Sequence, residues 1–129
     1  MRINVTKLMA ITPILVGAAL ISSVAWAHPK LKKSTPAQGS TLVEAPREVV
    51  LEFSEDVEPT LSKIEVKSVP GGKTVSEGKA TYSGDAKNTL RIALSAGLEN
   101  GKYVVAWKTT SVDTHKLKGE LKFTLQGKP

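Results

Sequence analysis

The sequence contains no cysteine, and this absence excludes disulfides, thiolate metal sites and a cysteine-linked lipid anchor. Aromatic residues are also scarce, with two each of Phe, Trp and Tyr. The two methionines, Met1 and Met9, both lie near the N-terminus. Beyond them the chain has no sulfur ligand for a soft metal ion, so nitrogen and oxygen donors are the only candidates for a metal site.

The first 27 residues have the features of a secretory signal peptide. A basic start precedes an apolar run from Leu8 to Ile21, and Ala25-Trp26-Ala27 has the small-residue pattern that signal peptidase cuts after. The run is short for a membrane-spanning helix, although an uncleaved anchor is the alternative. We therefore predict a cleaved leader at residues 1–27 and one domain at residues 28–129.

The charge balance is positive but modest. The whole chain carries a formal charge of +6, and removing the leader with Arg2 and Lys7 lowers it to +4. With so few aromatics this is a weak case for nucleic-acid binding. We interpret the lysines near the two histidines as a solvated surface, with docking of an acidic partner as the alternative; these lysines are Lys30, Lys32, Lys33, Lys116 and Lys118.

The rest of the chain alternates between apolar and polar residues, which predicts strands. About seven short strands at roughly ten-residue spacing, with no helical periodicity, indicate an all-β protein with an Ig-like antiparallel Greek-key sandwich or barrel. The predicted inward positions are Leu31, Val49, Leu51, Phe53, Ile64, Val66, Leu90, Ile92, Leu94, Tyr103, Val105, Trp107, Leu117, Gly119, Leu121, Phe123 and Leu125. Weaker edge strands are expected at 74–75 and 80–82, and Asn100-Gly101 is a strong turn signal.

Two aromatic residues of the strand at 103–107 have predicted structural roles. Tyr103 is a candidate for the tyrosine corner of Ig-like sandwiches, in which the hydroxyl ties down a loop that crosses between sheets. An ordinary half-buried strand tyrosine is the alternative. Trp107 is in phase with Tyr103 and is expected in the core.

Cleavage after Ala27 would make His28 the first residue of the mature chain. Its free α-amine and its own ring can then chelate one metal ion, and these nitrogens suit Cu(II). The next residue, Pro29, has no N–H, so the metal cannot proceed along the backbone by deprotonating successive amides. The chelate keeps room for ligands from elsewhere in the chain.

The only other histidine is His115, which lies two residues after Asp113 in a polar loop. Residues two apart in an extended segment point to the same side, so this carboxylate and imidazole can converge on one ion. The first strand of a sandwich can lie beside the last, which would bring the two ends together. We predict one copper site formed by His28, Asp113 and His115; ordinary polar loop residues are the alternative.

From His28 to Leu125 the chain resembles the CopC family of periplasmic copper-binding proteins (the CopC/YobA type). The resemblance rests on the terminal histidine after the leader and on two segments, STPAQGSTLVEAPREVVLEFSEDVEP and NGKYVVAWKTTSVDTHKLKGELKFTL. It implies an Ig-like sandwich in the periplasm that binds Cu(II) through His28, Asp113 and His115. It also implies a CopD-like inner-membrane protein as a possible partner in copper transfer.

The chain departs from the family pattern at Thr114 and Lys116, where the family often has Gly and Pro. If the family glycine has positive φ, the β-branched Thr114 should give the loop a different geometry. Some family members also carry a methionine-rich segment for Cu(I). The mature chain has no methionine, and we predict a Cu(II)-only member.

Three functions remain open from the sequence. The first is a monomeric, non-enzymatic Cu(II) carrier or buffer for copper homeostasis or resistance. The second is an Ig-like interaction module without a metal. The third is a copper monooxygenase, because a terminal histidine plus a second histidine also forms the histidine brace of such enzymes; a carboxylate at the site and the few aromatics argue against it.

Overall fold

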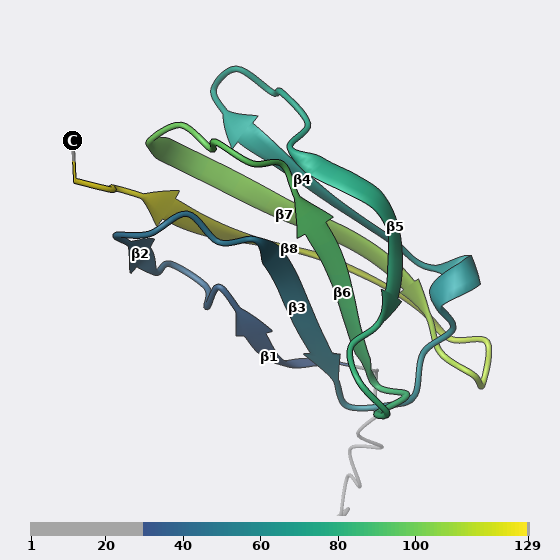
Figure 1. The fold of residues 1–129 in the computed structure, drawn as a ribbon. Helices are drawn as coiled ribbons and strands as arrows, with labels where there is room; N and C mark the ends of the chain where they lie inside the picture. Colours follow the sequence, from purple (N-terminus) through teal and green to yellow (C-terminus); the bar gives the residue numbers. More distant parts are fainter. Residues whose placement is uncertain (1–29, 129) are drawn as a thin grey trace, which may run out of the picture.

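The structure is a computed structural model that describes residues 30–128, which fold into two facing four-stranded sheets (Figure 1). One sheet has the strand order β1-β3-β6-β5 and the other β2-β8-β7-β4. The elements are β1 (Leu31–Thr35), β2 (Thr41–Leu42), β3 (Glu48–Phe53), the 3-10 helix η1 (Pro59–Leu61), β4 (Lys63–Val69), β5 (Ser76–Tyr82), β6 (Thr89–Leu94), β7 (Gly101–Thr110) and β8 (Lys116–Leu125). The predicted leader and His28 lie outside the described residues, so cleavage after Ala27 stays a prediction.

The predicted all-β sandwich is confirmed, with two differences of detail. The short strand β2 pairs with β8 in parallel, whereas every other strand pair is antiparallel. Of the weak edge strands expected at 74–75 and 80–82, the second lies within β5, whose pairing with β6 is irregular between Glu77 and Thr81. Thr74 forms only an isolated bridge with Lys67 of β4. Within residues 30–128 no helix has the length and apolar character needed to cross a membrane.

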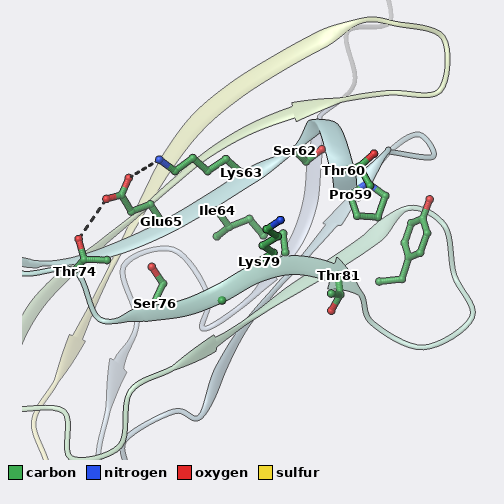
Figure 2. Close-up of a pocket in the computed structure, with 13 residues that line it drawn as sticks. Pro59, Thr60, Ser62, Lys63, Ile64, Glu65, Thr74, Ser76, Lys79 and Thr81 are labelled. Carbon is green, nitrogen blue, oxygen red and sulfur yellow. Dashed lines mark hydrogen bonds and ion pairs between the residues drawn. The ribbon is translucent and has the colours of Figure 1, made fainter.

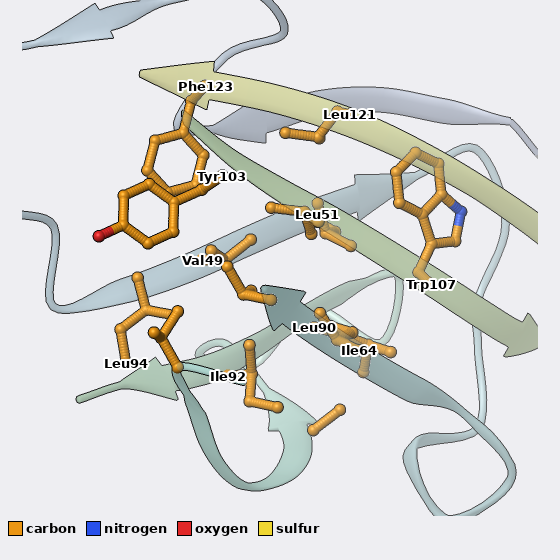
Figure 3. Packing of buried hydrophobic residues seen from close by; sticks show 14 of the residues in the cluster. Val49, Leu51, Ile64, Leu90, Ile92, Leu94, Tyr103, Trp107, Leu121 and Phe123 are labelled. Carbon is orange, nitrogen blue, oxygen red and sulfur yellow. The ribbon is translucent and has the colours of Figure 1, made fainter. Parts of the chain in front are cut away.

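The core lies between the two sheets and is formed by the alternating apolar residues (Figure 3). Val49, Leu51 and Phe53 of β3 are fully buried, while their neighbours Val50 and Glu52 are only partly buried. The same alternation along β4, β6, β7 and β8 places one face of each strand in the core. Leu31 and Leu117 lie at the margin, packed against this cluster. Burial of these side chains is the main favourable term in folding.

Tyr103 forms the predicted tyrosine corner. Its hydroxyl donates a hydrogen bond to the carbonyl of Glu99, which lies in the loop that leads from β6 in one sheet to β7 in the other. Its ring stacks on Phe123 of β8, with the ring centroids 5.2 Å apart. Burial raises the pKa of Tyr103 above its ordinary value, so the hydroxyl stays a donor over the physiological range.

The first and last strands do not lie beside each other in one sheet, although the sequence had left that arrangement open. β1 pairs with β3, while β8 lies between β2 and β7 in the opposite sheet. The cross-strand partners of Ser34 and Thr35 are Leu51 and Val50 of β3. The start of the described chain therefore lies beside the end of β3, and β3 is the strand that brings distant segments together.

Trp107 is buried, as predicted, and its indole covers Gly119 of β8. These two residues are cross-strand partners, and a Cβ atom added at Gly119 would lie 2.4 Å from Cζ2 of the Trp107 ring. A contact this short cannot be accommodated without moving the indole out of a close-packed core. Glycine at 119 is therefore required by the volume of Trp107.

We expect Gly119→Ala to lower the free energy of unfolding by about 1–3 kcal/mol, as overpacking of a core does. Equilibrium unfolding in urea measures the change. Gly71→Ala is the matched control, because an added Cβ there meets only Ser68 Oγ at 3.6 Å; it should stay within about 0.5 kcal/mol. Equal stability of Gly119→Ala and the natural protein would contradict this account of the Trp107 packing.

Candidate metal centre

The segment 54–58, which we call the acidic turn, follows β3 and holds Glu55, Asp56 and Glu58. Its first residue is tied to the start of the described chain. The Ser54 N–H donates to the Lys30 carbonyl at 2.8 Å, and the Lys30 N–H donates to Ser54 Oγ at 2.8 Å. This reciprocal pair fixes Lys30 beside the residue that precedes Glu55.

The other side of the acidic turn contacts residues 111–115, which we call the hairpin loop because they join β7 to β8. The Glu58 N–H donates to the Thr110 carbonyl at 2.8 Å, and the Val112 N–H donates to the Asp56 carbonyl at 3.1 Å. Between these bonds Val57 and Ser111 form an isolated antiparallel bridge. The turn and the loop are therefore held together by their backbones, whatever their side chains bind.

The hairpin loop is closed by its own hydrogen bonds. Ser111 is buried, and its N–H donates to the His115 carbonyl at 2.9 Å while its Oγ accepts from the His115 N–H at 3.1 Å. The Thr114 N–H donates to the Ser111 carbonyl at 2.9 Å. Thr114 has a φ of 69°, the left-handed region that a β-branched residue rarely adopts. The expectation that Thr114 turns the loop away from a positive-φ geometry is thus wrong.

This arrangement brings Asp113 and His115 together with Glu55. One donor atom from each residue lies within 4.8 Å of the other two. First-row metal ions hold nitrogen and oxygen ligands at about 2 Å, so ligands around one ion lie up to about 4 Å apart. Small side-chain adjustments would let the three residues share an ion. Two carboxylates and an imidazole are borderline or hard donors, which suit Cu(II) and other divalent ions.

Glu55 has a feature that points to a missing positive partner. Its Oε2 atom is buried and has no hydrogen-bond partner within residues 30–128. A carboxylate oxygen that is removed from water without a partner costs free energy, and a bound cation or donor would offset that cost. The Glu55 carboxylate is therefore suited to binding a cation or a hydrogen-bond donor, and one of its oxygens lies in the cluster with Asp113 and His115.

The structure brings two of the three predicted ligands together and places Glu55 beside them. Asp113 and His115 are exposed and share one cluster, whereas His28 lies outside the described residues. Sequence reasoning missed Glu55, which comes two residues after the end of β3. The missing information was the contact between that turn and the hairpin loop.

A cavity of about 880 Å³ lies elsewhere, in a groove between β4 and β5 (Figure 2). Its rim carries Lys63, Glu65 and Thr74, which interact with one another, and Lys79. None of Glu55, Asp113 and His115 lines this groove. The candidate metal site is therefore recognised by its donor atoms and not by the volume of a cavity.

Residues 31–126 match the family model described as the CopC domain. The chain belongs to the CopC family. The match covers every strand of the sandwich, the acidic turn and the hairpin loop. The family resemblance noted in the sequence is confirmed.

Individual members are similar over most of this CopC chain. Copper resistance protein C of Xanthomonas campestris pv. juglandis is 35% identical over 92% of this chain and 95% of its own length. The crystal structure of CopC from Methylosinus trichosporium OB3b superposes with a TM-score of 0.72 and 28% identity, over 79% of this chain and 97% of that chain. The copper transport protein CutJ of Bacillus subtilis is 29% identical over 81% of this chain but only 19% of its own length.

The strain at Thr114 gives a direct test of the loop geometry. Thr114→Gly should leave the free energy of unfolding unchanged or raise it by about 1 kcal/mol, because glycine adopts positive φ without steric cost. Val112→Gly in the same loop should lower it by about 1 kcal/mol, because no positive φ is relieved there. Urea unfolding of both variants measures the contrast; a Thr114→Gly protein as destabilised as Val112→Gly would contradict the strained geometry.

Proposed function

We propose that this CopC-family protein is a carrier or buffer that binds one Cu(II) ion through His28, Glu55, Asp113 and His115. The observation that carries the proposal is the cluster of Glu55, Asp113 and His115, with a buried carboxylate oxygen that lacks a partner. Family membership and the copper-related names of its relatives support copper as the metal.

The position of Lys30 supports a place for His28 in the same site. His28 is two residues before Lys30, and two residues of extended chain span at most about 7 Å. Lys30 is hydrogen-bonded to Ser54, the neighbour of Glu55. A mature terminus at His28 is therefore within reach of the cluster. Its α-amine and imidazole would supply two nitrogens, and His115 would supply a third.

The donor set favours Cu(II) over Cu(I). Imidazole, amine and carboxylate groups are harder than the thiolates and thioethers that select Cu(I), and no methionine or cysteine follows residue 27. The charges of Glu55 and Asp113 would neutralise the divalent ion. With two carboxylates beside the imidazole, the site is better suited to holding copper than to keeping open the position that oxygen activation requires.

The proposed cellular role is copper homeostasis or resistance in the periplasm, after removal of residues 1–27. We propose that the protein acts as a monomer without enzymatic activity. A CopD-like inner-membrane transport protein is the proposed partner in copper transfer. The match to about one fifth of the copper transport protein CutJ supports this partnership. In CutJ, a domain similar to this protein is part of the same polypeptide as the remaining four fifths of the transport protein.

The terminal chelate predicts that one extra residue before His28 abolishes tight binding. A Met-His28 protein keeps the imidazole, but its α-amine is moved away and the chelate ring cannot form. Competition against a Cu(II) chelator should show a loss of affinity of about 100-fold or more. A fusion cut by a protease to leave His28 first is the control, and it should bind like the secreted protein. Equal affinity with and without the extra residue would exclude the terminal amine as a ligand.

The three described residues should differ in their contributions. We expect His115→Ala to weaken Cu(II) binding by more than about 100-fold, beyond the 10–100-fold typical of residues that only support a ligand. Asp113→Asn should cost less and shift the copper EPR spectrum, because a charged oxygen donor is lost. Glu55→Gln should weaken binding by about tenfold or more.

Glu58→Gln is the matched control for Glu55→Gln. Both residues belong to the acidic turn and the net charge changes equally, but Glu58 is not part of the cluster. If Glu58→Gln weakens copper binding as much as Glu55→Gln does, the effect is one of overall charge. That result would remove Glu55 from the proposed ligand set.

A further inference from the structure

The two sheets of the sandwich differ strongly in charge. The strands β2, β8, β7 and β4 carry seven lysines and two glutamates, whereas β1, β3, β6 and β5 carry four basic and three acidic residues. The seven lysines are all exposed and alternate with core residues, so they point away from the core on one face. We call this the lysine face, and it consists of Lys63, Lys67, Lys102, Lys108, Lys116, Lys118 and Lys122.

The strand register places three of these lysines in one row. Lys63 of β4 is the cross-strand partner of Lys108 of β7, and Lys108 is the partner of Lys118 of β8. Like charges directly opposite each other destabilise a sheet. Lys63 has Glu65 at 3.6 Å, but no acidic group within residues 30–128 lies within ion-pair distance of Lys108 or Lys118. Glu65 offsets part of the cost of this row at Lys63, whereas no ion pair among the described residues offsets it at Lys108 and Lys118.

The adjacent row is small and acidic, and it leaves a hollow beside the lysines. Glu65, Ala106 and Glu120 are partners across the same three strands. Glu65 is paired with Lys67, whose Nζ lies 3.3 Å from Glu65 Oε1. The hydrogen bond and the charge of Lys67 lower the pKa of Glu65 below its ordinary value. The shallow basin has a volume of about 440 Å³. Lys108 and Lys118 border both this basin and a second one of about 410 Å³.

We propose that the lysine face docks the protein on an anionic phospholipid bilayer. The charge of this face is complementary to a surface of phosphate headgroups, and clustered lysines are attracted to such surfaces. All its basic residues are lysines, which act as flexible point charges; arginine is the residue that recognises a single carboxylate or phosphate with fixed geometry. A broad sheet of lysines thus fits a diffuse anionic surface better than one acidic peptide.

Docking on this face would also fix the position of the proposed copper site relative to the membrane. The hairpin loop joins the ends of β7 and β8, just beyond Lys108 and Lys116. Asp113 and His115 would therefore lie at the membrane margin of the docked protein, where a membrane transport protein could receive the metal. This last point rests on the proposed function, whereas docking itself requires no copper.

The test uses the secreted protein, with its mass checked for loss of residues 1–27, and sedimentation with lipid vesicles. Binding to vesicles of phosphatidylglycerol and phosphatidylcholine in equal parts should exceed binding to phosphatidylcholine alone, and it should fall as salt rises from about 20 to 300 mM. The variant Lys63→Gln, Lys108→Gln, Lys118→Gln should bind the anionic vesicles about 100-fold more weakly. Its stability should be equal or higher, because the row of like charges is removed, and its copper affinity should be retained.

The matched control is Lys32→Gln, Lys33→Gln, Lys79→Gln, which removes the same charge from the opposite sheet. It should lose no more than about threefold of the vesicle affinity. If the two variants lose vesicle affinity equally, the effect is one of net charge. That result would contradict docking through the lysine face. The protein could instead fail to bind anionic vesicles and bind polyglutamate in a salt-sensitive way. That result would contradict docking on a bilayer and indicate an acidic protein as the partner.

Discussion

The acidic turn at 54–58 is the constraint on which the site depends, because its backbone hydrogen bonds join three segments far apart in the sequence. Ser54 bonds to Lys30, while Val57 accepts a bond from the Tyr82 hydroxyl and donates one to the Lys87 carbonyl. Asp56 accepts a bond from Val112 of the hairpin loop, and Glu58 donates one to Thr110 at the end of β7. None of the groups that form these bonds is one of the proposed metal-binding side chains. The acidic turn therefore brings the N-terminal segment, Glu55 and the hairpin loop together in advance, so little of the binding free energy is spent on ordering the chain.

Features that are unfavourable on their own are concentrated near this turn and the hairpin loop. Thr114 has a positive φ, Glu55 Oε2 is buried without a partner, and Lys108 faces Lys118 across the hairpin. A fully buried core and ten-residue pairing of β7 with β8 can sustain these local costs. Local strain and unpaired charge are common where a protein binds a ligand or partner. A cation would offset the cost of the buried Glu55 oxygen, and an anionic surface would offset the repulsion between Lys108 and Lys118.

Much of the fold was predictable because apolar and polar residues alternate along each strand, and the apolar positions are the buried ones. Val49, Leu51 and Phe53 identify β3 and its inward face without any tertiary information, and the tyrosine corner follows from Tyr103 at the start of a late strand. The pairing partners were less accessible: β1 joins β3 instead of β8, since strand order depends on contacts between distant segments. Asp113 and His115 were predicted as ligands from their spacing, but Glu55 lies beside them only because hydrogen bonds join the acidic turn to the hairpin loop. The geometry of Thr114 was mispredicted because the closed hairpin loop overrides the local preference of a β-branched residue.

The central claim is that one Cu(II) ion joins the N-terminus, the acidic turn and the hairpin loop. The most direct measurement is the paramagnetic broadening of backbone amide signals in the NMR spectrum when one equivalent of Cu(II) is added to the secreted protein. The account predicts loss of the signals of Lys30, Glu55 and residues 113–115, while those of Gly71 and Leu98 persist. Broadening centred on the groove between β4 and β5, with the signals of Glu55 and His115 intact, would contradict it.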